Sequence, residues 1–154
     1  MKFSGKLKTI EDAINVKSVT IGRIKSAKGE GFTTSFLVLW LLYLNDILNL
    51  KRPMTENQME LCASMIMLEY PALKMTDLTY LFKKIIKGDF GAFYESLGID
   101  KVMSFFNLYY KERLDTAERM SDSEHAGFKN DLTFDYSTNL ERLWYGAKGF
   151  NSKK

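Results

Sequence analysis

Residues 87–100 read KGDFGAFYESLGID and contain two patterns associated with phosphate chemistry. Asp89, Phe90 and Gly91 spell DFG, the turn whose aspartate holds magnesium in protein kinases. Gly88 and Gly91 also spell G-x-x-G, the loop with which a KH domain clamps a nucleic-acid backbone. Either pattern would make the segment a phosphate-binding loop, so the surrounding sequence has to decide.

Neither interpretation has the partners that it needs. A kinase DFG works with a glycine-rich strand loop, a strand lysine and an HRD catalytic loop, and the 154-residue chain contains none of them. A KH domain needs a three-stranded sheet, and here the carboxylate of Asp89 would repel a phosphate. We therefore interpret the segment as a hinge in which Gly88 ends a helix and Phe90, Phe93 and Tyr94 pack between helices.

Other residues that could do chemistry lack the right neighbours. His125 is the single histidine and lies in the polar segment DSEHAGF, where no serine is marked as a nucleophile. Cys62 is the single cysteine and falls on the apolar face of a predicted helix, which is typical of a core residue. The segment from Gly22 to Gly31 does not spell a P-loop. We expect no catalytic residue, no cofactor and no metal site, and hence no enzyme.

Positive charge gathers in two places. Residues 1–28 carry seven Lys or Arg against two acidic residues, a net charge of +5, whereas the rest of the chain carries −2. A second group of cations lies in KKIIK, residues 83–87. Basic surfaces with nearby aromatic faces, here Tyr94, Tyr109 and Tyr110, are typical of nucleic-acid binding. The candidate nucleic-acid contacts are Lys17, Arg23, Lys25, Lys28, Lys83, Lys84, Lys87 and Arg113. The alternative is that the tyrosines are core residues and the lysines complement a helix dipole or are solvated.

The hydrophobic spacing predicts an all-α fold, a compact bundle of about four to six helices. TENQ at residues 55–58 matches a capping box and begins one helix, which Pro71 ends. Apolar residues from Leu78 to Ile86 recur at spacings of three and four and form the stripe of the next helix. Gly88 is placed to end that helix in a left-handed conformation.

Two further helices are expected to be long: one over residues 35–50, and one that Asp100 can cap and that runs to about residue 122. A short helix is also expected near residues 139–145. Residues 35–50, SFLVLWLLYLNDILNL, are apolar nearly all round, which favours the centre of a bundle or a subunit interface. Their longest apolar run has nine residues, whereas a bilayer span needs about 20, so we expect no membrane contact.

The domain organisation follows from these elements. Residues 1–32 are predicted to form a basic N-terminal arm or small hairpin, with a short helix capped by Thr9. Residues 33–154 are predicted to form the helical domain, with a core over 33–122 and a tail over 123–154 that folds back. The N-terminus lacks the apolar region of a signal peptide and one cysteine excludes an intramolecular disulfide, so we expect a cytoplasmic location.

The segment from Tyr70 to Arg113 is similar to one in small helical proteins of Bacteroidota phages and mobile elements. The features that carry the resemblance are Tyr70-Pro71, Leu73-Lys74, Thr76-Asp77, Gly88, Gly91, Phe93-Tyr94, Tyr110 and Glu112-Arg113. Its helix, Tyr-Pro, helix opening also resembles phage helicase-loader proteins. The resemblance implies a role beside phage-type replication genes in a bacterial cytoplasm, and it transfers no catalytic residue.

Two functions follow as hypotheses. The first is a non-enzymatic adaptor that binds DNA or a replication protein, like a helicase loader. The second is a protein-only interaction module, such as an inhibitor of a host or defence protein or a virion component. In the second case the chain would bind protein, or a further copy of itself, through residues 35–50.

Overall fold

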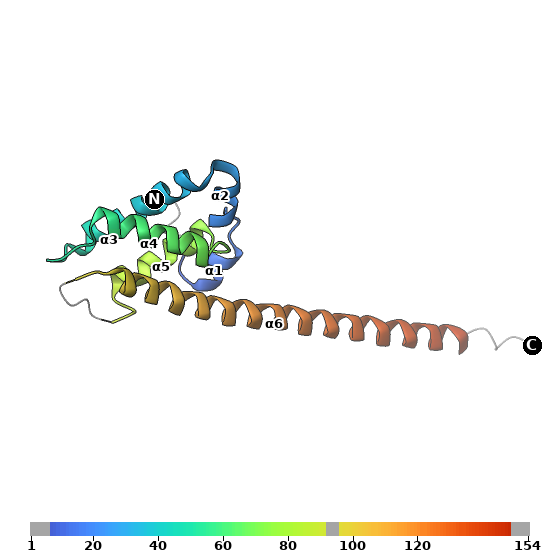
Figure 1. The fold of residues 1–154 in the computed structure, drawn as a ribbon. Coiled ribbons are helices and arrows are strands. Elements are labelled where there is room, and N and C mark those ends of the chain that lie inside the picture. The colour runs from blue at the N-terminus through green and yellow to red at the C-terminus, as the bar shows by residue number, and fades with distance from the viewer. Residues whose placement is uncertain (1–6, 92–95, 149–154) are drawn as a thin grey trace, which may run out of the picture. The chain divides into compact units, whose positions relative to one another are not determined.

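The computed structural model describes residues 7–91 and 96–148, with side chains as far as His125 apart from residue 124. In these ranges the chain is all-α, as predicted, and Figure 1 shows the order of its helices. The helices are α1 (Ile10–Asn15), α2 (Ile21–Lys28), α3 (Glu30–Leu48), α4 (Glu56–Glu69), α5 (Met75–Lys87) and α6 (Ile99–Lys148). The chain divides into two compact units, Met1–Thr116 and Ala117–Lys154.

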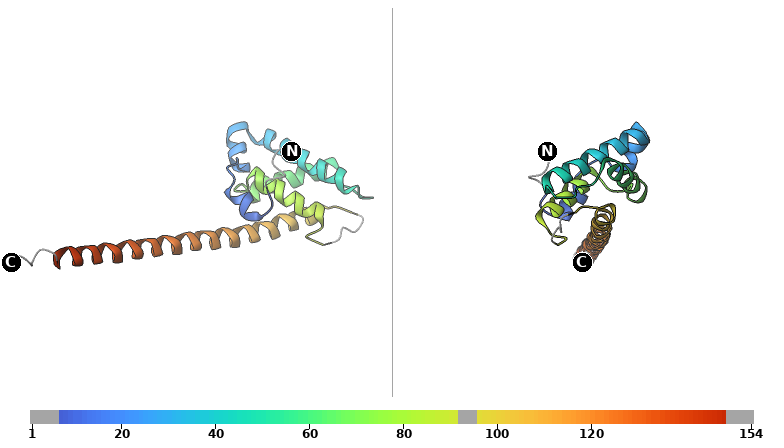
Figure 2. Two further views of the ribbon diagram at one scale, coloured as in Figure 1. Left: turned by 180° about the vertical axis from the view of Figure 1, so that it is seen from behind. Right: turned by 60° about the vertical axis from the view of Figure 1, so that its left-hand side comes forward.

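The first unit is built around one hydrophobic core to which α3, α4, α5 and the start of α6 all contribute. α4 packs along α3 and α1 packs on α5, as Figure 1 shows. Both views of Figure 2 place the first turns of α6 beside α5. The bulkiest buried side chains come from α6 and are Phe105, Phe106 and Tyr109. Burying a large apolar side chain contributes about 1.5–3 kcal/mol, so these residues anchor the start of α6.

The predicted capping box of α4 is present. Thr55 Oγ1 accepts from the Gln58 N–H at 3.4 Å, and Gln58 Oε1 accepts from the Thr55 N–H at 2.9 Å. The helix ends at Glu69, one residue before Tyr70-Pro71, because a residue that precedes proline is disfavoured in the helical region. Local sequence rules are therefore sufficient for both ends of α4.

The expectation of a small hairpin within residues 1–32 is wrong, because α1 and α2 occupy much of that segment. The first residues of α2 dock on the turn after α4: the Ile21 N–H donates to the Leu73 carbonyl and the Gly22 N–H donates to the Pro71 carbonyl, each at 2.9 Å. A side chain on Gly22 would meet Pro71, so glycine allows this close approach. The short helix capped by Thr9 is confirmed as α1.

α3 begins earlier than expected. Gly29, with a φ of 86°, ends α2 and is directly followed by Glu30 of α3. The first two turns of α3 are more polar than residues 36–48, and a pattern based on apolar residues therefore missed them. Thr33 lies inside the helix and its hydroxyl donates to the Gly29 carbonyl at 2.8 Å.

α6 begins at Ile99, so Asp100 lies in its first turn and is not the cap. The helix continues to Lys148, which makes the expected end near residue 122 wrong and places the predicted 139–145 helix inside α6. No proline interrupts the segment from Asp100 onward, so no residue forces the helix to stop. The folding back of residues 123–154 stays a prediction.

The hinge after α5 has the predicted glycine geometry. Gly88 ends α5 with a φ of 84°, in the left-handed region. The N–H groups of Gly88 and Asp89 donate to the carbonyls of Ile85 and Lys84 at 3.0 and 3.1 Å, which satisfies the end of the helix. The Phe90 ring packs 5.2 Å from that of Phe105, whereas Phe93 and Tyr94 lie outside the described residues.

Gly88→Ala should lower the free energy of unfolding by about 1–2 kcal/mol, because a Cβ disfavours the left-handed conformation. Gly31→Ala is the matched control, since Gly31 lies inside α3 with open space where its Cβ would be. That change should raise stability by about 0.5–1 kcal/mol. Urea unfolding monitored by circular dichroism measures both values. Equal effects in the two variants would contradict the assigned helix end.

Candidate functional site

Two of the three cations predicted at the end of α5 have partners within the fold. Lys83 Nζ donates to the Leu7 carbonyl at 3.1 Å. Lys84 forms an ion pair with Glu112 of α6 and also lies 5.3 Å from the centre of the Phe90 ring. Both side chains therefore already have partners within the fold.

Arg113 forms an ion pair with a buried carboxylate, that of Asp77. Asp77 is fully buried, and Arg113 Nε donates to both of its oxygens at 3.0 and 3.1 Å. The Tyr109 hydroxyl donates to Asp77 Oδ1 at 2.7 Å, and the Lys74 N–H donates to Oδ2 at 2.8 Å. Burial, and then the nearby Asp77, raises the pKa of Tyr109. Arg113 and Tyr109 are therefore structural, and Tyr109 cannot stack on a base.

The remaining predicted cations lie on the surface without forming one cluster. Lys17, Arg23 and Lys28 are exposed, and Lys25 forms an ion pair with Glu30 at 3.4 Å. Lys25 and Lys28 are three residues apart and lie on the same side of α2, whereas Arg23 lies on another side, so the three cations of α2 do not share one face. The eighth predicted cation, Lys87, is exposed on α5.

The single cysteine and the single histidine lie in different surroundings. Cys62 is fully buried, and burial raises its pKa to about 12, so the thiol stays protonated near neutral pH. His125 is exposed. Among the side chains that the structure describes, in residues 7–91, 96–123 and 125, no three of His, Cys, Asp or Glu lie close enough together to hold a metal ion.

The most unusual surface is an apolar face on α3. Leu37, Leu41 and Leu44 are buried in the core, yet large apolar side chains also cover the outward side of the helix. Leu39, for example, is 62% exposed. We call this surface the α3 face; its members are Phe32, Leu39, Leu42, Tyr43 and Ile47. A surface helix normally shows a polar face to water, so the α3 face is typical of an interaction surface.

α3 is also long and apolar enough to cross a membrane by length and composition, with 19 residues and a mean hydropathy of 1.4. Core helices pass the same test. In the first unit α3 packs on α2, α4 and α5 and supplies three buried leucines to the shared core. The absence of membrane contact stays a prediction.

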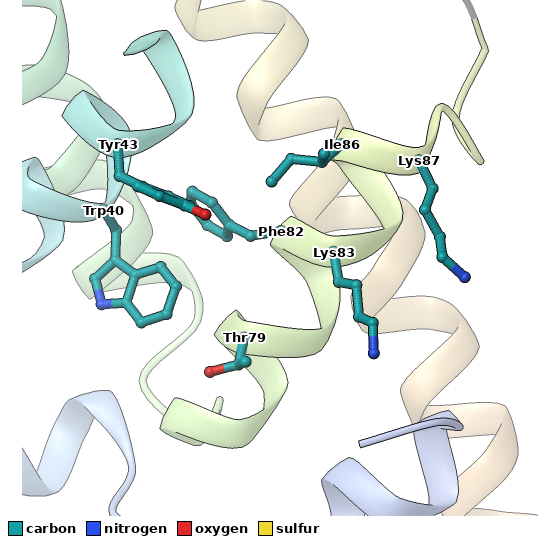
Figure 3. Close-up of a pocket in the computed structure, with 7 residues that line it drawn as sticks. All are labelled: Trp40, Tyr43, Thr79, Phe82, Lys83, Ile86 and Lys87. Carbon is teal, nitrogen blue, oxygen red and sulfur yellow. The ribbon is translucent and has the colours of Figure 1, made fainter. Parts of the chain in front are cut away.

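A groove of about 450 Å³ borders the α3 face and lies between α3 and α5. Figure 3 shows Trp40 and Tyr43 of α3 opposite Phe82 and Ile86 of α5. The Trp40 and Phe82 rings meet edge to face with their centres 5.2 Å apart. Tyr43 belongs to both the groove and the α3 face, so the two surfaces are continuous. The residues that line the groove are Trp40, Tyr43, Thr79, Phe82, Lys83, Ile86 and Lys87.

No known protein family, curated protein or solved structure matches the chain in comparisons of sequence and structure. The candidate site therefore depends on its own geometry. The sequence indicated an interface in residues 35–50, but it did not indicate the groove, because Phe82 and Ile86 read as one buried stripe. Ile86 is in fact 39% exposed, at the edge of that stripe.

A double-mutant cycle can measure the buried ion pair. Asp77→Ala alone should cost about 3–5 kcal/mol, because Arg113, whose side chain is only 14% exposed, would lose its counter-charge. In the cycle with Arg113→Ala, the coupling energy should be about 1.5–3 kcal/mol, as for hydrogen bonds to charged groups.

The matched control is the cycle of Lys84→Ala and Glu112→Ala. The Glu112 side chain is 44% exposed, whereas that of Asp77 is fully buried, so water screens this pair more and its coupling should be about 1 kcal/mol or less. Urea unfolding of the eight proteins supplies both coupling energies. A coupling between Asp77 and Arg113 no larger than the control would show that the buried pair does not hold α5 and α6 together.

Proposed function

We propose that the protein is a non-enzymatic interaction module that binds a protein partner through the α3 face. The observation that carries the proposal is the exposure of five large apolar side chains on a helix whose opposite side is already buried in the core. Single exposed apolar residues are ordinary on protein surfaces, but a contiguous group on one helix is typical of a docking surface.

The two sides of α3 are buried to different degrees. Leu37, Leu41 and Leu44 are buried in the core, whereas the apolar residues on the other side of α3 keep a large part of their surface exposed after folding. Each would contribute on binding, because covering apolar surface is favourable by about 25 cal/mol per Å². A partner that covers the α3 face therefore stabilises the complex without any change in the fold.

The proposed role includes adaptors of phages or mobile elements, in line with the resemblance seen between Tyr70 and Arg113. A second copy of the chain is one partner that such a face can take, because a two-fold axis brings the same surface together twice. Light scattering would identify that case as a dimer that becomes monomeric when the α3 face is made polar.

The α3 face can be tested with helical peptides, the simplest partner that inserts apolar residues into a helical surface. Binders are selected from a displayed library of 16-residue helical peptides against the full chain. The double variant Leu39→Ser and Ile47→Ser should weaken their binding by about tenfold or more, since both residues are exposed centres of the face. Fluorescence anisotropy measures the dissociation constants.

The matched control is Leu108→Ser with Leu114→Ser, which removes two exposed leucines from α6. This pair should leave peptide binding unchanged. Both double variants should keep their free energy of unfolding within about 0.5 kcal/mol per exposed residue, so lost binding cannot be attributed to unfolding. The proposal fails if no peptide is enriched, or if the control weakens binding as much as the α3 variant.

DNA binding is a second candidate, and it rests on a different observation. Lys17, Arg23 and Lys28 of the N-terminal segment are exposed. Lys83, Lys84 and Arg113, in contrast, have partners within the fold. Each exposed cation that meets a phosphate releases counterions and so favours binding. Among the eight predicted cations, the proposed DNA contact therefore uses those of the N-terminal segment and not Lys83, Lys84 or Arg113.

Arg23→Glu tests this candidate, with Lys111→Glu as a control that reverses one exposed charge on α6. If Arg23 contacts a phosphate, Arg23→Glu should reduce the slope of log K against log salt by about 0.9 or more. The control should shift affinity only slightly. Anisotropy with labelled single- and double-stranded DNA at several salt concentrations measures the slopes. Equal slopes for the two variants would exclude Arg23 from the contact.

A further inference from the structure

The apolar residues on the outer side of α3 follow a regular spacing. Phe32, Leu39, Tyr43 and Ile47 are exposed, and Phe36 is partly exposed. In chain order the five residues recur at intervals of four, three, four and four, which places them along one side of the helix. Figure 1 shows α3 along one edge of the first unit. We call these five residues the α3 seam, because apolar residues at such intervals form the contact between two helices in a coiled coil.

One charge near each end of α3 has no ion-pair partner among the described residues. Asp46 is exposed near the end of α3, and no ion pair joins it to a described residue. Lys28 is exposed two positions before α3 begins, and the same is true of it. Glu30, the other charged residue of α3, already pairs with Lys25 at 3.4 Å. A molecule that covers the seam therefore gains from an anion near the start of α3 and a cation near its end.

A second copy of α3 that runs in the opposite direction matches the seam. The middle of the stretch from Phe32 to Ile47 falls beside Leu39, and a two-fold axis at that point would relate the two copies. Phe32 of each copy would then lie opposite Ile47 of the other, and Phe36 would lie opposite Tyr43 of the other. Apolar residues would meet apolar residues along the whole seam, so both copies would cover the same surface at once.

The two charges near the ends of α3 favour this antiparallel direction. It brings Asp46 of each copy toward the start of the other α3, where Lys28 lies and where the helix dipole is positive. In a parallel pair the two Asp46 carboxylates would be neighbours, and each Lys28 would face a second Lys28. Opposite charges therefore meet in only one of the two directions.

We propose that two copies of the chain form an antiparallel dimer through the α3 seam, in which Asp46 of each copy pairs with Lys28 of the other. This inference rests on the proposed function, because it names the partner that covers the α3 face. By symmetry the second copy supplies its apolar residues and both charges in matching positions, whereas an unrelated helix has to match them independently.

The charges of α3 also disfavour occupants other than protein. Bases can stack on Phe32 and Tyr43, but the phosphates that join them would meet Asp46 and Glu30, and α3 contains no lysine or arginine. Helices that lie on anionic membranes carry Lys or Arg on their polar face, and α3 has neither. A second copy of the chain is the occupant that uses both Asp46 and Lys28.

Sedimentation equilibrium of the full chain tests the dimer over about 1–500 µM, because small interfaces give weak dimers. The molecular mass should rise with concentration from that of one chain to that of two. Leu39→Ser with Ile47→Ser should raise the dimer dissociation constant about tenfold or more, since both residues lie in the seam. Leu108→Ser with Leu114→Ser, which removes two exposed leucines from α6, should leave it unchanged.

A charge exchange tests the direction of the pair. Asp46→Lys and Lys28→Asp should each weaken the dimer about fivefold or more, because each change places two like-charged pairs across the two-fold axis. The two variants mixed in equal amounts should recover the original affinity as a heterodimer, since every charge then meets its opposite. Lys111→Glu, a charge reversal on α6, should leave the dimer unchanged.

A chain that stays monomeric over this range, a dimer that the seam variant does not weaken, or charge variants without loss and recovery would overturn the inference. The peptide selection then decides the proposed function separately. If enriched peptides depend on Leu39 and Ile47, the α3 face binds another protein, and only the second copy is excluded as its partner. If no peptide is enriched either, both fail.

Discussion

The packing of the first unit depends on one buried carboxylate. Asp77 has no exposure to solvent, and an isolated charge there would cost several kcal/mol. Three donors from separate positions compensate it: the Lys74 N–H at the start of α5, the Tyr109 hydroxyl and the Arg113 guanidinium of α6. Because hydrogen bonds are directional, this arrangement permits one rotation of α6 about α5. The apolar stripe of α5 then faces the core, and Ile86 and Lys87 are left at its edge.

The rotation of α6 about α5 also determines which cations can contact a partner. Arg113 is turned inward by Asp77. Lys84, about two turns along α5 from Asp77, pairs with Glu112, and Lys83 donates to the Leu7 carbonyl. The sequence groups the three lysines of residues 83–87 with Arg113. In the structure, Lys83, Lys84 and Arg113 have partners within the fold, and Lys87 is exposed. The charge that is left over lies beside the aromatic wall of the groove, and a surface with both properties is more selective than either alone.

α3 connects the fold to the proposed function. Its inner leucines are required for the core, whereas its outer apolar residues have no partner in the described chain that buries them. Keeping such a face in water is unfavourable for a protein that acts alone, and it favours association. The groove extends this surface onto α5, so a partner that covers both would touch two elements whose relative position the core already holds. A binding surface that is organised in advance loses less entropy on association.

The sequence by itself determined the all-α class and the ends of several helices. Thr55 with Gln58, Thr9 with Asp12, Pro71 and Gly88 act on neighbours within a few residues, so their effects can be predicted from spacing. The tertiary structure decided the rest. α2 depends on hydrogen bonds to Pro71 and Leu73, about 50 residues away, and the roles of Arg113 and Lys83 depend on Asp77 and Leu7. The separation of Ile86 from the buried stripe likewise depends on how α5 packs. These contacts join residues distant in the chain, and no local pattern encodes them.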